Sequence, residues 1–542
     1  MQNKVIQYNI YIAIIASLLF IPFLGNVHLF DWDEINFAEC AREMIVTGDF
    51  FSVKINYLPF WEKPPVFIWM QALSMKVFGV NEFAARFPNA VCGVITLLVL
   101  FNIGRKLFDI RFGFLWTLVY AGSFLPHFYF KSGIIDPWFN LFIFLGIYYF
   151  IQFTNNNSSG YKYPVLSALF IGIGIMTKGP VAFLIFALCF GVYYLIKRFQ
   201  PVISIKQMLV YAAALAAVGG LWFLMLALTG NTSIIKEFFL YQVRLFNTQD
   251  AGHGGPFIYH FVVLLIGCFP ASIFALRSFR SNAYDTPYQK HFKLWMMILF
   301  WVVLLLFSIV KTKIVHYSSL CYFPLSFLGV YVVHKLLNGE LSWKKSTAVL
   351  LMIISSLIGI AISTLPIVNA FKETIIEADL IKDKFAVENL KAAVNWTGFE
   401  WLIGVGLILG TMILLIYRAK QQKNALIGIF LISLLSVNLA SLVIAPRIEP
   451  YSQGAAIEFY QSLQGKDCYV ETIGFKSYAH LFYSAKQPQA NSNNTDIGWL
   501  LTGDVDKPSY FVSKITSVDE IKQNYPHLIE LYRKNGFVFW KR

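Results

Sequence analysis

The sequence predicts an all-α polytopic membrane protein with about 13 transmembrane helices, amphipathic helices on one membrane face, and a small soluble α/β domain at its C-terminus. Of its 542 residues, 57% are hydrophobic and only 14% are charged. The long apolar runs lack the alternating polar pattern of barrel strands, so helices are the expected spanning elements. After Pro450 the composition becomes that of a soluble domain.

Thirteen segments are apolar over about the length that a helix needs to cross a bilayer. They lie near residues 8–24, 84–104, 112–129, 134–153, 162–177, 179–196, 207–229, 257–277, 293–310, 314–335, 346–366, 400–417 and 425–444. The pair that meets at Thr177-Lys178-Gly179-Pro180 can also be interpreted as one broken helix.

The loop charges predict the orientation of these spans. With the N-terminus in the cytoplasm, the loops on that side carry eighteen Lys and Arg residues and three acidic ones, whereas residues 25–82 on the other side carry eight acids and four cations. The positive-inside rule therefore places the C-terminus outside. The net charge of +14 is explained by this asymmetry and not by nucleic-acid binding, and no glycine-rich nucleotide loop is present.

Two domains are predicted, a transmembrane domain at residues 1–446 and a soluble domain at 447–542. In the first external loop, 25–82, an apolar face of Phe37, Ala41, Met44 and Ile45 predicts a short helix on the membrane surface, and Pro64-Pro65 precedes a second at about 66–78. The soluble domain should contain a helix near 453–464 and strands at 467–472, 479–484, 508–513 and 536–541.

Acidic residues crowd the start of this first loop. Asp33, with Glu34 beside it, is a candidate general base that takes a proton from a substrate hydroxyl. The alternative is that Asp31 or Asp33 only caps the N-terminus of the helix. Asp136, before Pro137 on the same membrane face, is either a second catalytic carboxylate or another helix-start residue.

Basic residues at span ends on this face suggest a site for phosphate. Lysines pair well with phosphate at headgroup level, although each lysine alone is better explained by snorkelling to the interface. The candidates for substrate binding are Lys63, Lys178, Arg42, Lys131 and Lys313, with His316 and Tyr317 continuing the site. Glu62 and His253 are a candidate pair of ligands for a divalent metal ion, or His253 is an ordinary loop histidine.

Several short motifs follow one another around the predicted spans: Asp33-Glu34, Ala38-Glu39, Ala41-Arg42-Glu43-Met44, Glu62-Lys63-Pro64-Pro65, Asp136-Pro137, Thr177-Lys178-Gly179-Pro180, and His253 before Pro256-Phe257. Together they resemble the bacterial membrane glycosyltransferases of the GT-C class, particularly the lipid A aminoarabinose transferase and protein mannosyltransferase group.

The resemblance implies transfer of a sugar from a polyprenyl-phosphate donor to a lipid, glycan or protein acceptor, with inversion, at the periplasmic face of the bacterial cytoplasmic (inner) membrane. It matches Asp33 and Asp136 to the catalytic acids, Lys63 and Lys178 to cations near the donor phosphate, and Glu62 and His253 to a metal site. Relatives tend to have Arg-Tyr where this chain has Asn36-Phe37, so the resemblance does not specify which sugar is transferred or which acceptor receives it.

Two other classes of function fit some of these features. A lipid or sugar transporter, or a flippase, also has many spans with charged groups, but transporters place them near the bilayer midplane in repeated halves. An assembly protein that acts through its soluble tail leaves the acidic loop unexplained. The clustering of charges at the outer span ends favours the enzyme.

Overall fold

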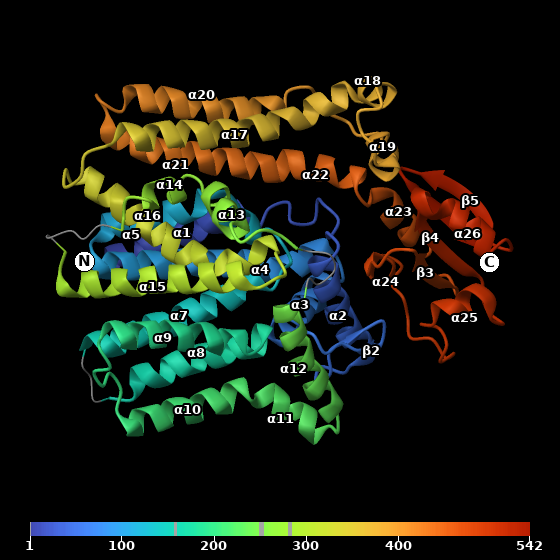
Figure 1. Ribbon diagram of the computed structural model, residues 1–542, viewed down its shortest axis with the longest axis horizontal. Helices are drawn as coiled ribbons and strands as arrows, with labels where there is room; N and C mark the ends of the chain where they lie inside the picture. Colours follow the sequence, from blue (N-terminus) through green and yellow to red (C-terminus); the bar gives the residue numbers. More distant parts are fainter. Residues whose placement is uncertain (1, 157–159, 249–253, 280–284) are drawn as a thin grey trace.

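The computed structural model describes the chain except for residues 1, 157–159, 249–253 and 280–284. Its larger part is a bundle of helices that lie along the long axis of the molecule (Figure 1). These helices are α1 (Gln2–Phe20), α4 (Glu82–Leu107), α5 (Ile110–Ala121), α6 (Phe124–Tyr129), α7 (Asp136–Asn156), α8 (Lys162–Lys178), α9 (Val181–Ile196), α10 (Ile205–Gly219), α11 (Leu221–Leu228), α13 (Tyr259–Gly267), α14 (Ala271–Ala275), α15 (Pro287–Ile309), α16 (Tyr322–Leu337), α17 (Lys345–Ala370), α20 (Trp401–Tyr417) and α21 (Gln422–Leu439).

The chain is a multi-pass membrane protein. Within the described residues, seven helices are long and apolar enough to cross a membrane, or eight if the bent pair α10 and α11 is one span. Four shorter apolar helices accompany them, α3 (Val66–Phe78), α5, α9 and α20. Each of the thirteen predicted segments coincides with one helix or with a broken pair, such as α5 with α6 and α13 with α14.

The turn at Gly179 separates two helices that pack side by side, α8 and α9 (Figure 1), so this segment is not one broken span. Gly179 has φ +102°, a backbone conformation open to glycine but strained for other residues. A Cβ atom there would come within 2.7 Å of the Phe238 ring. Glycine therefore permits both the turn and the close approach of this aromatic side chain.

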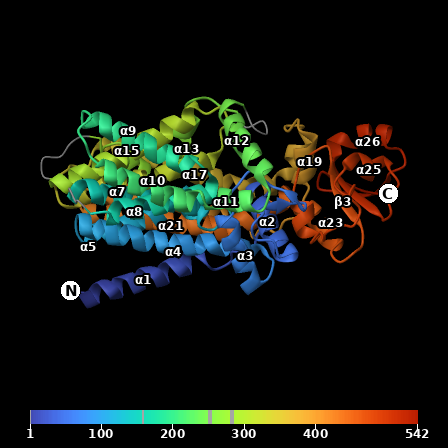
Figure 2. The same cartoon turned by 90° about the horizontal axis from the view of Figure 1, so that it is seen from below.

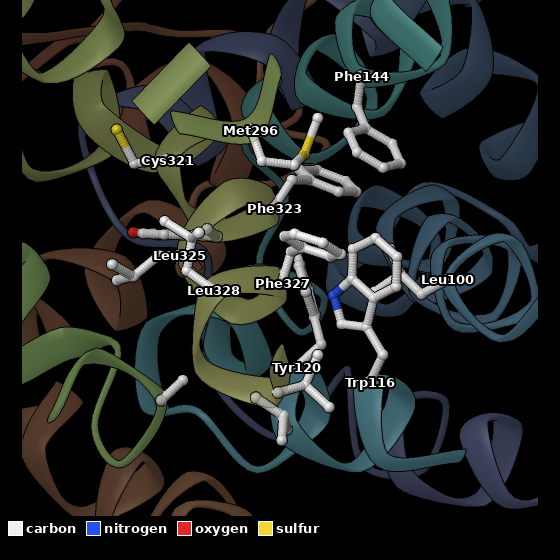
Figure 3. Close-up of a cluster of buried hydrophobic side chains, with 14 of the residues drawn as sticks. Leu100, Trp116, Tyr120, Phe144, Met296, Cys321, Phe323, Leu325, Phe327 and Leu328 are labelled. Carbon is white, nitrogen blue, oxygen red and sulfur yellow. The ribbon is translucent and has the colours of Figure 1, made fainter. Parts of the chain in front are cut away.

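Aromatic side chains form the centre of the bundle (Figure 3). Trp116 and Phe327 have ring centroids 5.2 Å apart, and those of Phe144 and Phe323 are 4.4 Å apart. The indole of Trp116 donates a hydrogen bond to Ser326 Oγ at 3.0 Å, which satisfies its polar atom within the core. This packing joins α5, α7 and α16 into the rigid body from which the site is built.

The first long loop, residues 25–82, forms α2 (Asp33–Thr47), the short strands β1 (Lys54–Ile55) and β2 (Leu58–Pro59), and α3 (Val66–Phe78). Figures 1 and 2 show α2 between the helical bundle and the C-terminal sheet. Every residue from Glu34 to Met44 is buried, so the predicted helix forms but its charged positions are not exposed to solvent. Two of the buried acids consequently form ion pairs, Glu34 with Arg86 and Glu39 with Arg42.

The C-terminal part contains a four-stranded sheet in the order β3-β4-β6-β5, with β3 parallel to β4 and the other neighbours antiparallel. Its elements are α23 (Gly454–Ser462), β3 (Tyr469–Ile473), α24 (Ala479–Tyr483), α25 (Ile497–Thr502), β4 (Ser509–Lys514), α26 (Val518–Asn524), β5 (Ile529–Lys534) and β6 (Phe537–Lys541). The strand predicted at 479–484 is wrong, because this short apolar run is the buried helix α24, which packs on α2. Strand β5 was not predicted.

The structure contains further helices outside these groups. They are α12 (Thr232–Asn247), the 3₁₀ helix at Val315–Cys321, α18 (Lys372–Glu377), α19 (Lys384–Leu390) and α22 (Ala445–Ile448). One hydrophobic cluster includes Ile35 and Ala41 of α2, Tyr483 of α24 and Phe539 of β6. The first loop and the C-terminal part therefore share a core.

Candidate active site

A cavity of about 670 Å³ opens where α2, α7 and the α8–α9 turn meet. Eight of the predicted site residues line it, and they come from stretches far apart in the sequence. These residues are Asp33, Glu34, Glu62, Lys63, Asp136, Lys178, His316 and Tyr317. The structure therefore brings most of the predicted site together at one end of the membrane bundle.

Asp33 is the first residue of α2 and faces His316 across the cavity wall. Its Oδ2 lies 3.4 Å from His316 Nε2, and its side chain is 30% exposed. The position before the helix is occupied by Trp32, and no side chain caps the N-terminus of α2. The capping interpretation of Asp31 or Asp33 is therefore wrong, and the Asp33 carboxylate is open to the cavity.

Asp136 and Lys178 form a buried ion pair. Lys178 Nζ lies 2.7 Å from Asp136 Oδ1, while Asp136 Oδ2 has no hydrogen-bond partner among the described residues. The ammonium also lies 5.5 Å from the centroid of the Tyr317 ring. Asp136 begins α7 and Lys178 ends α8, so the packing of these two helices sets the position of the cation.

Lys63 supplies a second cation to the same cavity. Its Nζ lies 5.2 Å from the centroid of the Tyr241 ring of α12. Burial lowers the pKa of Lys63, an effect partly opposed by Glu62, Asp33 and Asp136. An anionic ligand beside Lys63 would therefore favour its charged form and gain binding energy from it.

Glu34, predicted to be catalytic, lines the cavity but is bound by groups of the protein. Arg86 donates from Nε to Glu34 Oε1 at 3.0 Å and from Nη2 to Oε2 at 2.8 Å, and the amides of Phe30 and Gly133 donate to the same carboxylate. Burial raises its pKa, but Arg86 and these donors outweigh burial and hold the pKa below its usual value. Its contacts are those of a structural anchor between α2 and α4.

Arg42, predicted to bind substrate, does not line the cavity. Its Nη2 donates to Glu39 Oε1 at 2.6 Å and to the carbonyl oxygen of Lys486 at 2.7 Å. The guanidinium is only 2% exposed and joins α2 to the C-terminal part.

Lys131 and Lys313 are also absent from the cavity lining. The Lys131 ammonium donates to the carbonyl oxygens of Leu19 and Pro22 at 3.0 and 3.3 Å. That of Lys313 donates to three carbonyl oxygens around the end of α15, those of Phe307, Ser308 and Val310. Both lysines satisfy backbone acceptors, a role that sequence patterns do not separate from phosphate binding.

Of the two predicted metal ligands, the structure describes only Glu62, which lines the cavity. His253 lies outside the described residues. The described residues contain no group of three His, Cys, Asp or Glu side chains that would hold a metal ion.

Other residues that line the cavity were not predicted as site residues, among them Trp32, Asn36, Asn140 and Tyr241. Asn140 donates to Ser319 Oγ at 2.8 Å, and that hydroxyl donates to the carbonyl oxygen of His316 at 2.6 Å. Asn140 lies one helical turn after Asp136, and a buried amide there inside a span was the available signal. The site thus combines an open carboxylate, two cations and aromatic walls, a set suited to proton abstraction beside an anionic group.

The family described as dolichyl-phosphate-mannose-protein mannosyltransferase matches residues 62–225 of this chain. The undecaprenyl phosphate-alpha-4-amino-4-deoxy-L-arabinose arabinosyl transferase of Photorhabdus laumondii is 26% identical over 354 residues, which is 61% of each chain. The enzyme of the same description from Edwardsiella ictaluri is 28% identical over 338 residues, 61% of this chain and 60% of that relative. The matches thus span about three fifths of these curated relatives.

The likeness in three dimensions extends over nearly the whole chain. The crystal structure of ArnT from Cupriavidus metallidurans bound to undecaprenyl phosphate superposes with a TM-score of 0.76, covering 99% of this chain and 98% of that one at 16% identity. The apo crystal structure of the same protein gives the same TM-score. The chain therefore has the fold of this GT-C protein, and its predicted resemblance to the aminoarabinose transferase and protein mannosyltransferase group is confirmed.

Proposed function

We propose that this protein is an integral membrane glycosyltransferase that transfers a sugar from a polyprenyl-phosphate donor to a lipid, glycan or protein acceptor. The curated relatives carry names that specify an undecaprenyl phosphate-linked sugar, and the ArnT crystal structure contains undecaprenyl phosphate. The cavity at the end of the bundle has the charges that such a donor requires. Residues 1–446 are the proposed transferase domain, with 447–542 as a second domain.

Asp33 is the proposed general base. It takes the proton of an acceptor hydroxyl, whose oxygen attacks the anomeric carbon of the sugar while the bond from that carbon to the phosphate oxygen breaks. The bonding electrons leave with the polyprenyl phosphate, and the attack from the opposite side inverts the anomeric carbon. His316, 3.4 Å from Asp33, helps to orient the carboxylate.

Lys178 and Lys63 are the proposed partners of the departing phosphate. Its negative charge increases as the sugar bond breaks, so positioned ammonium groups stabilise the transition state more than the ground state. Asp136 holds Lys178 at 2.7 Å and thereby directs the cation into the cavity. Tyr317, beside the Lys178 ammonium, contributes part of the cavity wall.

This proposal rests on one observation. Asp33, Lys63, Lys178 and Asp136 line the same cavity, and the Asp33 carboxylate is accessible from it. Purified full-length Asp33→Asn should bind undecaprenyl phosphate like the wild type but lose transfer from a polyprenyl-phosphate sugar by at least about a hundredfold. Asp49→Asn is the matched control, because Asp49 lies in the same loop and pairs with Lys54 away from the cavity. Full activity of Asp33→Asn would refute the assignment of the base.

The site is proposed to face the periplasm of a bacterial inner membrane, with the C-terminal domain on the same side. The distribution of loop cations supports this orientation. Fusions of alkaline phosphatase and of green fluorescent protein after Arg542 test it, since the phosphatase is active only outside the cytoplasm. An active phosphatase and a dark fluorescent protein are expected, and the reverse would overturn the orientation.

A divalent metal ion held partly by Glu62 and His253 is a separate proposal. Glu62 offers carboxylate oxygens at the cavity wall, but the described residues do not by themselves complete a metal site. No step of the proposed reaction therefore uses a metal. Elemental analysis of purified protein should show metal that decreases in Glu62→Gln, and equal content in both proteins would remove Glu62 from this role.

A further inference from the structure

The 3₁₀ helix at Val315–Cys321 carries His316 and Tyr317 to the wall of the cavity. A 3₁₀ helix has poorer backbone hydrogen bonds than an α-helix, so its position depends more on the groups that hold it from outside. Two neighbouring serines of this helix, Ser318 and Ser319, supply such contacts, and both are buried. Each serine is bound by a side chain from a different helix of the bundle.

Ser319 connects α7 to the backbone of His316. Its hydroxyl donates to the carbonyl oxygen of His316 at 2.6 Å and accepts from Asn140 Nδ2 at 2.8 Å. A serine hydroxyl has only one proton, so the bond to the carbonyl group leaves its oxygen as an acceptor for the Asn140 amide. A chain of two hydrogen bonds therefore runs from the Asn140 side chain to the backbone of His316.

Ser318 is held separately. Its Oγ lies 3.0 Å from Nδ1 of His260, a buried residue of α13. This contact does not depend on the Ser319 hydroxyl. Loss of that hydroxyl would therefore leave the 3₁₀ helix attached to α13 and release only the backbone at His316.

Asn140 lies four residues after Asp136 in α7, so the two side chains are on the same face of the helix, about 6 Å apart along its axis. Asp136 binds Lys178 at 2.7 Å. Asn140 holds the backbone of His316, and His316 Nε2 lies 3.4 Å from Asp33 Oδ2. One turn of α7 thus sets the separation between the proposed base and a proposed partner of the departing phosphate.

We propose that Asn140 and Ser319 are positioning residues that align His316, and through it the Asp33 carboxylate, for sugar transfer. Neither residue takes part in a bond that forms or breaks. A misplacement of about 1 Å in the reacting groups is enough to slow a reaction strongly. Loss of the chain should therefore lower turnover and leave donor affinity, which depends on the cavity lysines, unchanged. The inference rests on the proposed function and adds to the residues of that site.

Ser319→Ala in the full-length protein tests this role by steady-state sugar transfer and by direct binding of undecaprenyl phosphate. Turnover should be about tenfold below that of the wild type, with a dissociation constant within about twofold of it. Asn140→Ala should lower turnover equally, because the Ser319 hydroxyl then loses its partner in α7. Ser319→Ala combined with His316→Ala should be no slower than His316→Ala alone, since both changes interrupt the same chain of contacts.

Ser326→Ala is the matched control. Ser326 is a buried serine of α16 that also donates to the carbonyl oxygen three residues earlier, that of Phe323, and accepts from a side chain of another helix, the indole of Trp116. Ser326 does not line the cavity. Its replacement should cost about as much thermal stability as that of Ser319 and leave turnover unchanged.

Wild-type turnover in Ser319→Ala would overturn the positioning role, as would additive losses with His316→Ala or an equal loss of turnover in Ser326→Ala. Loss of undecaprenyl phosphate binding in Ser319→Ala would also overturn it, because the hydroxyl would then support the whole site. Each of these results leaves the proposed function intact if the wild type transfers sugar. A wild-type protein that neither binds undecaprenyl phosphate nor transfers sugar would refute the proposed function, and this inference with it.

Discussion

The Leu29 amide donates a hydrogen bond to the Tyr483 hydroxyl at 2.6 Å, although the two residues are 454 positions apart in the chain. Gln453 Nε2 donates to the carbonyl oxygen of Leu29 at 2.7 Å, so the C-terminal domain holds both backbone groups of this residue. Asp33 begins α2 only four positions later. The C-terminal domain thereby helps to fix the segment that carries the proposed base.

Tyr483→Phe should reduce the turnover of sugar transfer about fivefold without changing the affinity for undecaprenyl phosphate. The ring still packs in the shared core, but the hydrogen bond to Leu29, with a net value of about 1 kcal/mol, is lost. Steady-state transfer and direct binding measure the two effects separately. Tyr532→Phe, at an exposed tyrosine of the same domain, is the control, and equal turnover in both variants would contradict the positioning role.

The Asp136–Lys178 pair should show coupled effects on binding and stability. Lys178→Met removes a cation from the donor phosphate and should weaken undecaprenyl phosphate binding at least about tenfold. It also leaves Asp136 buried without its partner, which costs stability. Adding Asp136→Asn should restore much of the thermal stability but not the binding.

A double-mutant cycle of melting temperatures and dissociation constants measures this coupling. Lys54→Met, which breaks the partly exposed pair with Asp49, is the control and should change neither quantity appreciably. Additive stability effects at positions 136 and 178 would show that the ion pair does not act as a unit.

Glu34→Gln should destabilise the protein by about 3–5 kcal/mol, because it leaves Arg86 buried without its carboxylate. Thermal unfolding in detergent checks this expectation. The fraction that remains folded should still transfer sugar within a few-fold of the wild-type rate. Glu82→Gln, close to Arg86 in the chain but without an ion pair among the described residues, is the control. A stable but inactive Glu34→Gln would instead make Glu34 catalytic.

Ionisation of the buried Glu43 carboxyl group should lower the free energy of unfolding as pH rises above about 4.5. Burial and the neighbouring Glu39 raise the pKa of Glu43 above its ordinary value of 4.5. A raised carboxyl pKa means that the stabilisation is complete below about 4.5 and is lost as pH rises through the folded-state pKa. The carboxylate must then ionise beside Glu39 inside the structure.

Glu43→Gln removes this ionisation and retains an oxygen for the Tyr57 amide, which donates to Glu43 Oε2 at 2.8 Å. Its melting temperature relative to the wild type should therefore be higher at pH 9 than at pH 5. Glu458→Gln, at an exposed glutamate, should show no such pH dependence. A constant difference between Glu43→Gln and the wild type would contradict the raised pKa.

Sequence patterns predicted the helices and some of the cavity residues, but not the partners of individual charged side chains. The apolar segments predicted the helices because membrane insertion requires a local run of apolar residues. Asp33, Asp136 and Lys178 were predicted as site residues because charges at span ends are costly and few, and all three line the cavity. Arg42, Lys131 and Lys313 met the same criterion, yet their partners are Glu39 and backbone carbonyl groups. A sequence does not reveal which acceptor lies within reach of a long side chain.

By itself, the sequence determined that this chain crosses a membrane many times, that its acids and lysines gather at one set of span ends, and that a soluble domain follows. These properties depend on local composition and on motif order. Only the tertiary structure decided that α2 is buried between the bundle and the C-terminal sheet, that Arg86 binds Glu34, and that Tyr483 reaches Leu29. Such contacts join positions far apart in the chain, so they depend on how the helices and the sheet pack.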